Sequence, residues 1–427
     1  MSLIGTLATG VSGLLTNSRA LNIIGDNISN VNTTGFKSSK AVFGDLFSTS
    51  LGGGTLTSQV GRGAQLIGSL QSFAQGSFEL STNALDLAID GNGFFIVNDG
   101  TGNFYTRAGQ FRVNENGLVE VLTGEILQGF EILANNVVGN TLTDVSLTGV
   151  QSQPQPTTTF TLGAQLDGSE VNPFTFNSPI QVFNSVGTQD ILNIQFTREP
   201  ATVPTTNLWS VLITSQEGTV TTGAAGFLEF GPTGQLIDVD IGAAVLGNTV
   251  TDWAIIIDYS TGVPPAALLP INWDLADTIL LNPGVTNGDM TAFAAPSANN
   301  SVIQDGFGSG VLVGVGVDFD GTVFGSFDNG QSQNLFQLGL ANFLSPTGLT
   351  RLGQNLFGES RLSGQPIISL PETGSFGSVL GSTLELSNVD LAEEFVNLIK
   401  TQQAFVASAR IISTTDELLT ETVNLTR

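Results

Sequence analysis

The first residues of the chain form an amphipathic stretch, IGTLATGVSGLLTNSRALNIIGDNI, which runs from Ile4 to Ile28. Residues spaced alternately by three and four positions make up one stripe: Ile4, Leu7, Val11, Leu14, Ser18, Leu21, Gly25 and Ile28. This heptad pattern predicts a helix roughly 40 Å long, at about 1.5 Å per residue, with one packed seam. Each glycine in the stretch weakens an isolated helix by about 0.5–1 kcal/mol, so we expect the helix to need neighbours.

The other end of the chain carries a second seam with the same spacing. Its members are Leu391, Phe395, Leu398, Gln402, Phe405, Ala409, Ile412, Asp416, Leu419 and Val423. Ser387 or Asn388 can cap the start of this helix. Asp390, Glu393 and Glu394 follow in the first turns, where the helix dipole favours negative charge. The sequence therefore predicts a helix at each end.

Two seams at opposite ends favour an oligomeric coiled-coil layer over two helices that each pack only on their own domain. The ends are also weakly complementary in charge: residues 1–40 carry three bases and one acid (+2), and residues 388–427 carry six acids and three bases (−3). We predict a polymer interface made of the apolar seam residues. They are Ile4, Leu7, Val11, Leu14, Leu21, Ile28, Leu391, Phe395, Leu398, Phe405, Ala409, Ile412, Leu419 and Val423.

Between the ends, the apolar residues recur with a period of two, which is typical of β-strands. Apolar runs flank a glycine-containing polar turn in four places, and each of these predicts a hairpin. The four segments are Leu85–Val97, Phe111–Val121, Leu228–Val239 and Val317–Phe327. The expected fold is mainly β with α-helical termini.

One segment in the middle differs in composition from its flanks. Residues 151–300 hold all three tryptophans and thirteen acids against a single base, Arg198. We predict an inserted outer β domain, with the tryptophans in its core. The predicted parts are an N-terminal helix and linker (1–74), an inner β domain in two segments (75–150 and 301–377), the insert (151–300) and a C-terminal helix (378–427).

Composition excludes several classes of function. The chain has 427 residues, a net charge of −25 and only 12 basic residues, which disfavours nucleic acid or an anionic membrane as a partner. It contains no cysteine and no histidine, which excludes disulfides and the commonest metal sites and acid–base catalysts. The N-terminus lacks the basic leader of a secretory signal, and no stretch is apolar enough to span a membrane. We expect no cofactor.

Two other classes of function stay open from the residues alone. The pairs Asp238 and Asp240, and Asp318 and Asp320, could serve a glycan-acting enzyme, because glycosidases use two carboxylates. Acidity and Asp-Gly turns could also suit a calcium-dependent adhesin, although the tandem repeats of such proteins are absent.

Four motifs resemble those of the flagellar rod and hook axial proteins, and they occur in that family's order. They are NISNVNTTGFK (Asn27–Lys37), LDLAIDGNGFFIV (Leu85–Val97), YTRAGQFRVNENG (Tyr105–Gly117) and NVDLAEEFVNLIKTQQAF (Asn388–Phe405). The signature residues of the first motif are Asn27, Asn30, Val31, Asn32, Gly35 and Phe36. Rod proteins are generally shorter, so the large insert favours a hook protein, with a distal rod protein as the alternative.

The resemblance implies a subunit of a helical homopolymer, with paired terminal helices lining a tube and the insert facing solvent. It also implies the other partners: rod, hook-cap and hook–filament junction proteins, and the flagellar type III export apparatus. By the same resemblance the protein is exported without a cleaved signal and lies outside the cell, where it forms a flexible joint that transmits torque.

Overall fold

The computed structural model describes residues 3–46, 49–50, 59–133, 136–171, 173–200, 207–242, 252–262, 264–275 and 290–425. Internal contacts divide the chain into two compact units. The first comprises Met1–Gly149, Gly314–Ser326 and Ser332–Arg427, and the second Val150–Val313 and Phe327–Gln331. The mainly β fold with a helix at each end is confirmed. The bounds 151–300 for an independently folding insert stay a prediction.

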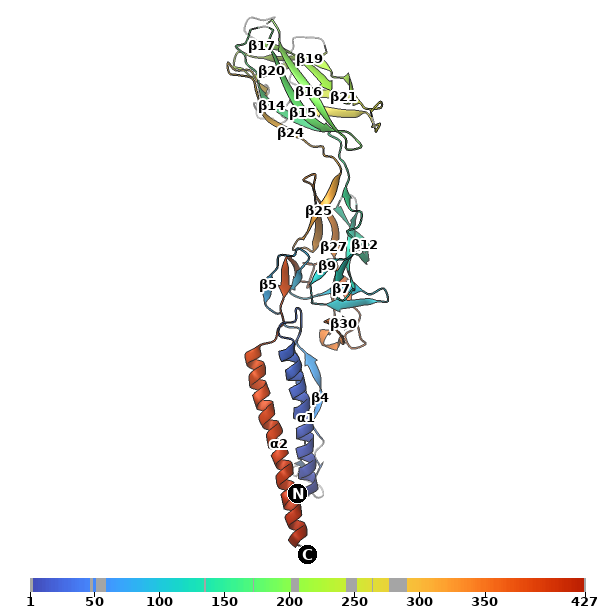
Figure 1. Ribbon diagram of the computed structural model, residues 1–427, viewed down its shortest axis with the longest axis vertical. Coiled ribbons are helices and arrows are strands. Elements are labelled where there is room, and N and C mark those ends of the chain that lie inside the picture. Colours follow the sequence, from blue (N-terminus) through green and yellow to red (C-terminus); the bar gives the residue numbers. More distant parts are fainter. Residues whose placement is uncertain are drawn as a thin grey trace. The chain divides into compact units, whose positions relative to one another are not determined.

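The first unit contains both helices, α1 (Leu3–Ser29) and α2 (Leu391–Leu425). They lie side by side and run in opposite directions (Figure 1). A two-stranded sheet of β1 (Ser39–Asp45) and β4 (Ala64–Gln71) follows α1 and packs against it. No helix of the described ranges is both long and apolar enough to cross a membrane.

The β part of the first unit is centred on β7 (Phe94–Asn98), which pairs with three strands: β8 (Asn103–Thr106), β11 (Ile126–Leu133) and β28 (Leu340–Asn342). The outer strands are β9 (Phe111–Val113), β10 (Val119–Val121), β12 (Val137–Asp144), β26 (Thr322–Phe327), β27 (Ser332–Leu338), β29 (Thr350–Gly353), β30 (Leu356–Gly358) and β31 (Ile367–Ser369). Strands from both ends of the sequence therefore build one sheet.

An aromatic core holds these strands together. Phe94 lies with its ring edge-to-face against Phe73, Phe343 and Phe357, at centroid distances of 5.4, 5.9 and 5.9 Å. Each such pair contributes about 0.5–1.5 kcal/mol beyond the apolar area that it buries. The core joins residues from distant parts of the sequence, so it fixes the two chain segments to each other.

Three of the predicted hairpins are confirmed and one is wrong. β9 pairs with β10, β19 (Ala225–Phe230) pairs with β20 (Leu236–Ile241), and β25 (Gly310–Val317) pairs with β26. In Leu85–Val97 both strands exist, but β6 (Leu87–Asp90) pairs with β32 (Ser378–Gly381) and not with β7. Arg107 explains part of this result, because its guanidinium binds the carbonyl oxygens of Ile89 and Gly91.

Beside that pair lies a second short ladder, β5 (Phe78–Leu80) with β33 (Thr383–Glu385). β33 lies shortly before α2 in the sequence, and β5 follows β4. The two short ladders therefore carry the chain from the helix pair into the β sheet.

The second unit contains two sheets. One has the strand order β15 (Thr175–Phe183), β16 (Gln189–Arg198), β17 (Asn207–Ser215), β19 and β20. The other contains β14 (Thr159–Gln165), β18 (Thr219–Thr222), β21 (Trp253–Asp258), β22 (Leu269–Trp273), β23 (Met290–Thr291) and β24 (Ala298–Gln304). Buried and exposed residues alternate along β16, as expected for a sheet with one packed face.

The tryptophans belong to the core of the second unit, as predicted. Trp209, Trp253 and Trp273 are fully buried in one hydrophobic cluster. Trp273 stacks between Trp253 and Phe160, at centroid distances of 5.7 and 5.6 Å. Because all tryptophans of the chain lie here, their fluorescence reports on this unit alone.

Candidate polymerisation surface

The two helices approach each other through small residues of α1. An added Cβ would lie 3.0 Å from Ile412 Cγ1 at Gly10, and 2.8 Å from Ser408 Oγ at Gly13. At the other end of α1, Asn27 Nδ2 donates a hydrogen bond of 2.9 Å to Glu394 Oε1. The glycines therefore allow a close backbone approach, a role that the sequence reasoning did not assign to them.

The predicted seam of α1 lies beside this contact. The residues of α1 that are buried are Gly10, Thr16, Ala20, Ile24 and Asn27. The predicted interface residues are more accessible: Ile4 and Val11 are exposed, and Leu7, Leu14, Leu21 and Ile28 are half-buried. Much of the apolar seam is thus left uncovered within one copy of the chain.

The predicted seam of α2 is divided in the same way. Its half-buried members are Leu398, Phe405, Ala409, Ile412 and Leu419, and its exposed members are Leu391, Phe395 and Val423. The sequence reasoning missed a further group of exposed apolar residues on α2: Val396, Ile399, Val406, Ile411 and Leu418. That these surfaces form an interface between copies stays a prediction.

The cap of α2 differs from the predicted one. Asp390 Oδ1 accepts hydrogen bonds from the backbone N–H groups of Ala392 and Glu393, at 2.8 and 3.3 Å. Asn388 instead joins the chain to the loop before β5, because its Nδ2 donates to the carbonyl oxygens of Ser72 and Ala74. The predicted caps Ser387 and Asn388 are therefore wrong, and the acidic residue next to them takes this role.

The signature residues after α1 hold the loop that leaves the helix. Asn27 is buried and bonds both backbone groups of Ser39, at 2.8 and 2.9 Å. Asn30 Nδ2 donates to the backbone and side chain of Asp26. Gly35 has a φ of +70°, and an added Cβ there would lie 2.5 Å from the backbone nitrogen of Ala108. Phe36 is buried, Val31 is half-buried and Asn32 is exposed.

A buried cluster of charges joins this loop to the residues before α2. Lys37 Nζ lies 2.6 Å from Glu385 Oε1, and Arg107 Nη1 lies 3.4 Å from Glu385 Oε2. The Lys37 and Glu385 side chains are fully buried. Gly76 N–H also donates to Glu385, and Lys37 donates to the carbonyl oxygen of Ala74. We call these three charged residues, Lys37, Arg107 and Glu385, the ion cluster.

Electrostatics in the ion cluster are dominated by burial. Loss of hydration lowers the pKa of Lys37, and the nearby carboxylate of Glu385 opposes that shift. The same two effects act on Arg107, whose pKa is also lowered. The sequence reasoning missed the cluster because its members are far apart in the chain, although Lys37 belongs to the first motif.

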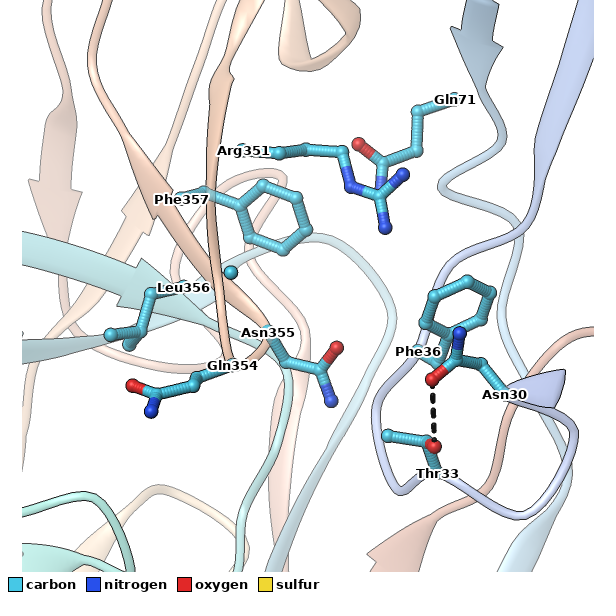
Figure 2. A pocket seen from close by; sticks show the side chains of 10 residues that line it. Asn30, Thr33, Phe36, Gln71, Arg351, Gln354, Asn355, Leu356 and Phe357 are labelled. Carbon is cyan, nitrogen blue, oxygen red and sulfur yellow. Dashed lines mark hydrogen bonds between the residues drawn. The ribbon is translucent and has the colours of Figure 1, made fainter. Parts of the chain in front are cut away.

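A pocket of about 170 Å³ lies between the signature loop and the hairpin of β29 and β30 (Figure 2). Gln354 and Asn355 form the turn, with φ values of 54° and 60°. Asn355 Nδ2 donates to the carbonyl oxygen of Thr34, which holds the hairpin against the loop. Phe36 and Arg351 line the pocket, and the guanidinium carbon lies 5.6 Å from the ring centroid.

The acidic pairs that could serve a glycan-acting enzyme lie in strand β20 and in the turn before β26. Asp238 is buried in β20, and Asp320 accepts two hydrogen bonds from Thr322 within a turn. In the described part of the chain, no group of three or more acidic side chains could hold a metal ion.

Four protein-family models match the chain, in sequence order. They are "Flagella basal body rod protein" at residues 7–37, "Flagellar hook protein FlgE/F/G D1 domain" at 88–162, "Flagellar basal body protein FlaE D2 domain" at 150–307 and "Flagellar basal body rod FlgEFG protein C-terminal" at 381–425. The matches thus include both ends and the middle of the chain.

Whole-chain relatives point to the same family. The flagellar hook protein FlgE of Borreliella burgdorferi is 31% identical, and the match covers 98% of this chain and 99% of that protein. FlgE of Escherichia coli is also 31% identical, over 97% of this chain and 98% of that protein. The crystal structure of Helicobacter pylori FlgE2 matches 70% of this chain and 98% of that one, with a TM-score of 0.44 and 13% identity. With near-complete coverage at this identity, the chain belongs to the flagellar hook protein FlgE family.

Proposed function

We propose that this flagellar hook subunit polymerises through α1 and α2, which present their uncovered apolar residues to other copies. Members of this family are structural proteins, so the comparisons support neither a glycan-acting enzyme nor a calcium-dependent adhesin. The relatives named above are hook proteins and not distal rod proteins. Self-assembly in the flagellar hook follows from the family, and the surface that performs it is our proposal.

The observation that carries the proposal is the apolar exposure of both helices. Ile4, Val11 and Phe395 are exposed in a single copy, although each belongs to a heptad seam. Apolar side chains at heptad positions add no stability while they are exposed to solvent. They stabilise the helix only when a neighbouring surface buries them. When α1 of one copy contacts α2 of the next without the reciprocal contact, the interface is heterologous, and such interfaces build open helical polymers when they do not close into rings.

The same proposal covers the partners and the location that the family resemblance implies. Rod, hook-cap and hook–filament junction proteins would adjoin the ends of the polymer. The subunit would pass unfolded through the flagellar type III export apparatus, without cleavage of a signal, to a position outside the cell. A chain without cysteine fits this route, because no disulfide can lock it into a folded state.

We also propose that the polymer bends while it transmits torque. Only 11% of the residues are charged, and glycine is abundant, with 52 residues. Surfaces with few long charged side chains form few specific ion pairs, so neighbouring outer domains could slide over each other at low cost.

The test is a pair of matched substitutions. Phe395, on α2, is 49% exposed, and Phe293, in the second unit, is 48% exposed. Phe395→Ser should raise the critical concentration for polymerisation by roughly 10- to 100-fold, since a buried phenylalanine contributes about 1.5–3 kcal/mol. Sedimentation of purified protein measures this concentration, and negative-stain images identify tubes.

Phe293→Ser is the control, because it removes a ring of the same exposure outside the helices. It should leave the critical concentration within about twofold of the wild-type value, well below the change that one buried ring produces. Equal effects of the two substitutions would contradict the proposal that α2 is a polymerisation surface.

A further inference from the structure

We propose that the pocket beside Arg351 receives a carboxylate side chain from a second copy of the chain. This inference rests on the proposed polymerisation and names a specific contact within it. The pocket lies between the loop that follows α1 and the β29–β30 hairpin, so both of its walls belong to the first unit (Figure 2).

The guanidinium of Arg351 is held in place, but only some of its N–H groups donate hydrogen bonds. It lies over the Phe36 ring, and its Nη1 donates to Ser39 Oγ at 3.3 Å. Within the residues that the structure describes, Nε and Nη2 have no hydrogen-bond partner. Asp26 Oδ2 lies 3.7 Å from Nη1, but both side chains are nearly half exposed, so this pair contributes little.

The pocket suits a carboxylate on a short side chain. Its volume of about 170 Å³ is well above the roughly 10–15 Å³ that one water requires, so it has room for more than a single small ion. Buried rings of Phe36 and Phe357 form apolar walls that can cover methylene groups. The planar guanidinium fork pairs best with a carboxylate, which can accept two parallel hydrogen bonds.

The hairpin turn supplies a second polar residue at the edge of the pocket. The side-chain amide of Gln354 has no hydrogen-bond partner among the described residues, and its backbone is fixed in a tight turn with a φ of 54°. Figure 2 shows the side chains of Arg351, Asn355 and Phe36 around one open space, and the amide of Gln354 points away from it. An incoming carboxylate would therefore meet the Arg351 guanidinium as its charged donor, beside a turn whose backbone is fixed.

A second copy of the chain is the occupant that the charges favour. The chain has 37 acidic residues and only 12 basic ones, so each neighbour in a polymer presents many carboxylates to few cations. The pocket also begins at Asn30, directly after the end of α1 at Ser29. It is thus adjacent to the helix that we propose as a polymerisation surface.

The experiment compares Arg351→Gln with Arg361→Gln, which removes the same charge from an exposed position nearby in the chain. Arg351→Gln should raise the critical concentration for polymerisation roughly tenfold relative to Arg361→Gln, because hydrogen bonds to a charged group are the strong ones. Arg351→Lys keeps the positive charge but loses the two parallel donors of the guanidinium. Its critical concentration should therefore lie between those of wild type and Arg351→Gln. Circular dichroism of the monomers verifies that each variant is folded.

A second arm uses acetate as the probe and includes the wild-type chain, which carries no substitution. Sodium acetate in place of sodium chloride at equal ionic strength should raise the critical concentration of wild type and of Arg361→Gln, but not of Arg351→Gln. Equal critical concentrations for the two glutamine variants, without an acetate effect, would overturn this inference alone. A wild-type chain that forms no polymer would overturn the proposed function and this inference with it.

Discussion

Glu385 is the residue at which the two ends of the chain meet the β sheet. Its carboxylate contacts Lys37 from the loop after α1, Arg107 from the loop after β8, and the backbone N–H of Gly76. Its own backbone carbonyl accepts a hydrogen bond from Gly35. One buried side chain thus bonds to three separate segments of the first unit.

Glu385→Gln should destabilise the first unit strongly. It removes the carboxylate that Lys37 and Arg107 share and leaves two buried cations without it, a change that typically costs about 3–5 kcal/mol. Urea unfolding followed by circular dichroism of the helices should measure this loss. Tryptophan fluorescence should show an unchanged transition of the second unit, because no tryptophan lies in the first.

Lys37→Met is the matched comparison for that experiment. It leaves the Arg107–Glu385 pair intact, and both acceptors of Lys37 keep another donor: Gly76 N–H for Glu385 and Asn388 for the Ala74 carbonyl. The loss should therefore be smaller, roughly 1–3 kcal/mol. If Lys37→Met proved as costly as Glu385→Gln, the shared carboxylate would not be the centre of the ion cluster.

The lowered pKa of Lys37 predicts a dependence of stability on pH. Unfolded, Lys37 titrates near 10.5, whereas burial lowers its pKa in the folded protein. Between those two values the unfolded chain binds more protons, so the contribution of Lys37 to the free energy of unfolding increases as pH rises toward 10.5. The difference between wild type and Lys37→Met in urea unfolding, measured from neutral pH upward, should grow with pH. A flat difference would refute this assignment.

At the scale of elements, α1 has two faces with different tasks. Small residues face α2 within one copy, and larger apolar residues remain accessible beside them. The heptad spacing predicted that a helix exists, because periodicity reports on the helix itself. It could not show which stripe packs inside the copy, because a glycine contributes nothing to an apolar pattern and yet permits the closest backbone approach.

Gly10→Val should separate the two helices. A Cβ at this position would already lie 3.0 Å from Ile412 and 3.3 Å from Ile411, and overpacking of this kind typically costs about 1–3 kcal/mol. Gly25→Ala is the control on the same helix, because no atom lies within 4 Å of its added Cβ. It should instead stabilise the monomer by about 0.5–1 kcal/mol. Thermal unfolding of both variants, followed in the helix signal, tests the contrast, which fails if both change stability in the same direction.

Other elements show why a local sequence pattern predicts a strand but not the strand with which it pairs. The alternation in Leu85–Val97 correctly indicated strands, but β6 found its partner in β32, nearly 300 residues later in the chain. The ion cluster is a similar case, since Lys37 and Glu385 are 348 residues apart. The spacing of apolar residues indicates which face of a helix or strand is buried. Which other element packs against that face depends on the rest of the fold.

At the scale of the whole molecule, net charge predicts how salt affects the polymer. The segment 151–300 carries thirteen acids and one base, so equivalent segments of neighbouring copies repel each other. Salt screens this repulsion over about 8–10 Å at ionic strengths near 0.1–0.15 M. The critical concentration for polymerisation should therefore fall as sodium chloride is added. Tubes that are equally stable at low and high salt would argue against repulsion between these segments.

The whole fold was predictable at the level of class and much less so at the level of contacts. Helical seams at the ends, strands between them and buried tryptophans all followed from the sequence. The seam gave the apolar candidates for the surface between copies. It gave no indication of the pocket beside Arg351, because that pocket is made by a loop and a hairpin more than 300 residues apart.

The antiparallel pairing of α1 with α2 also bears on the order in which the chain can fold. Asn27 and Glu394 are 367 residues apart, whereas the second unit is built almost entirely from one continuous segment. Contacts between distant residues form late, because the intervening loop must first be closed. During synthesis, which delivers the N-terminus first, α1 must therefore wait unpaired until nearly the last residue of the chain has arrived.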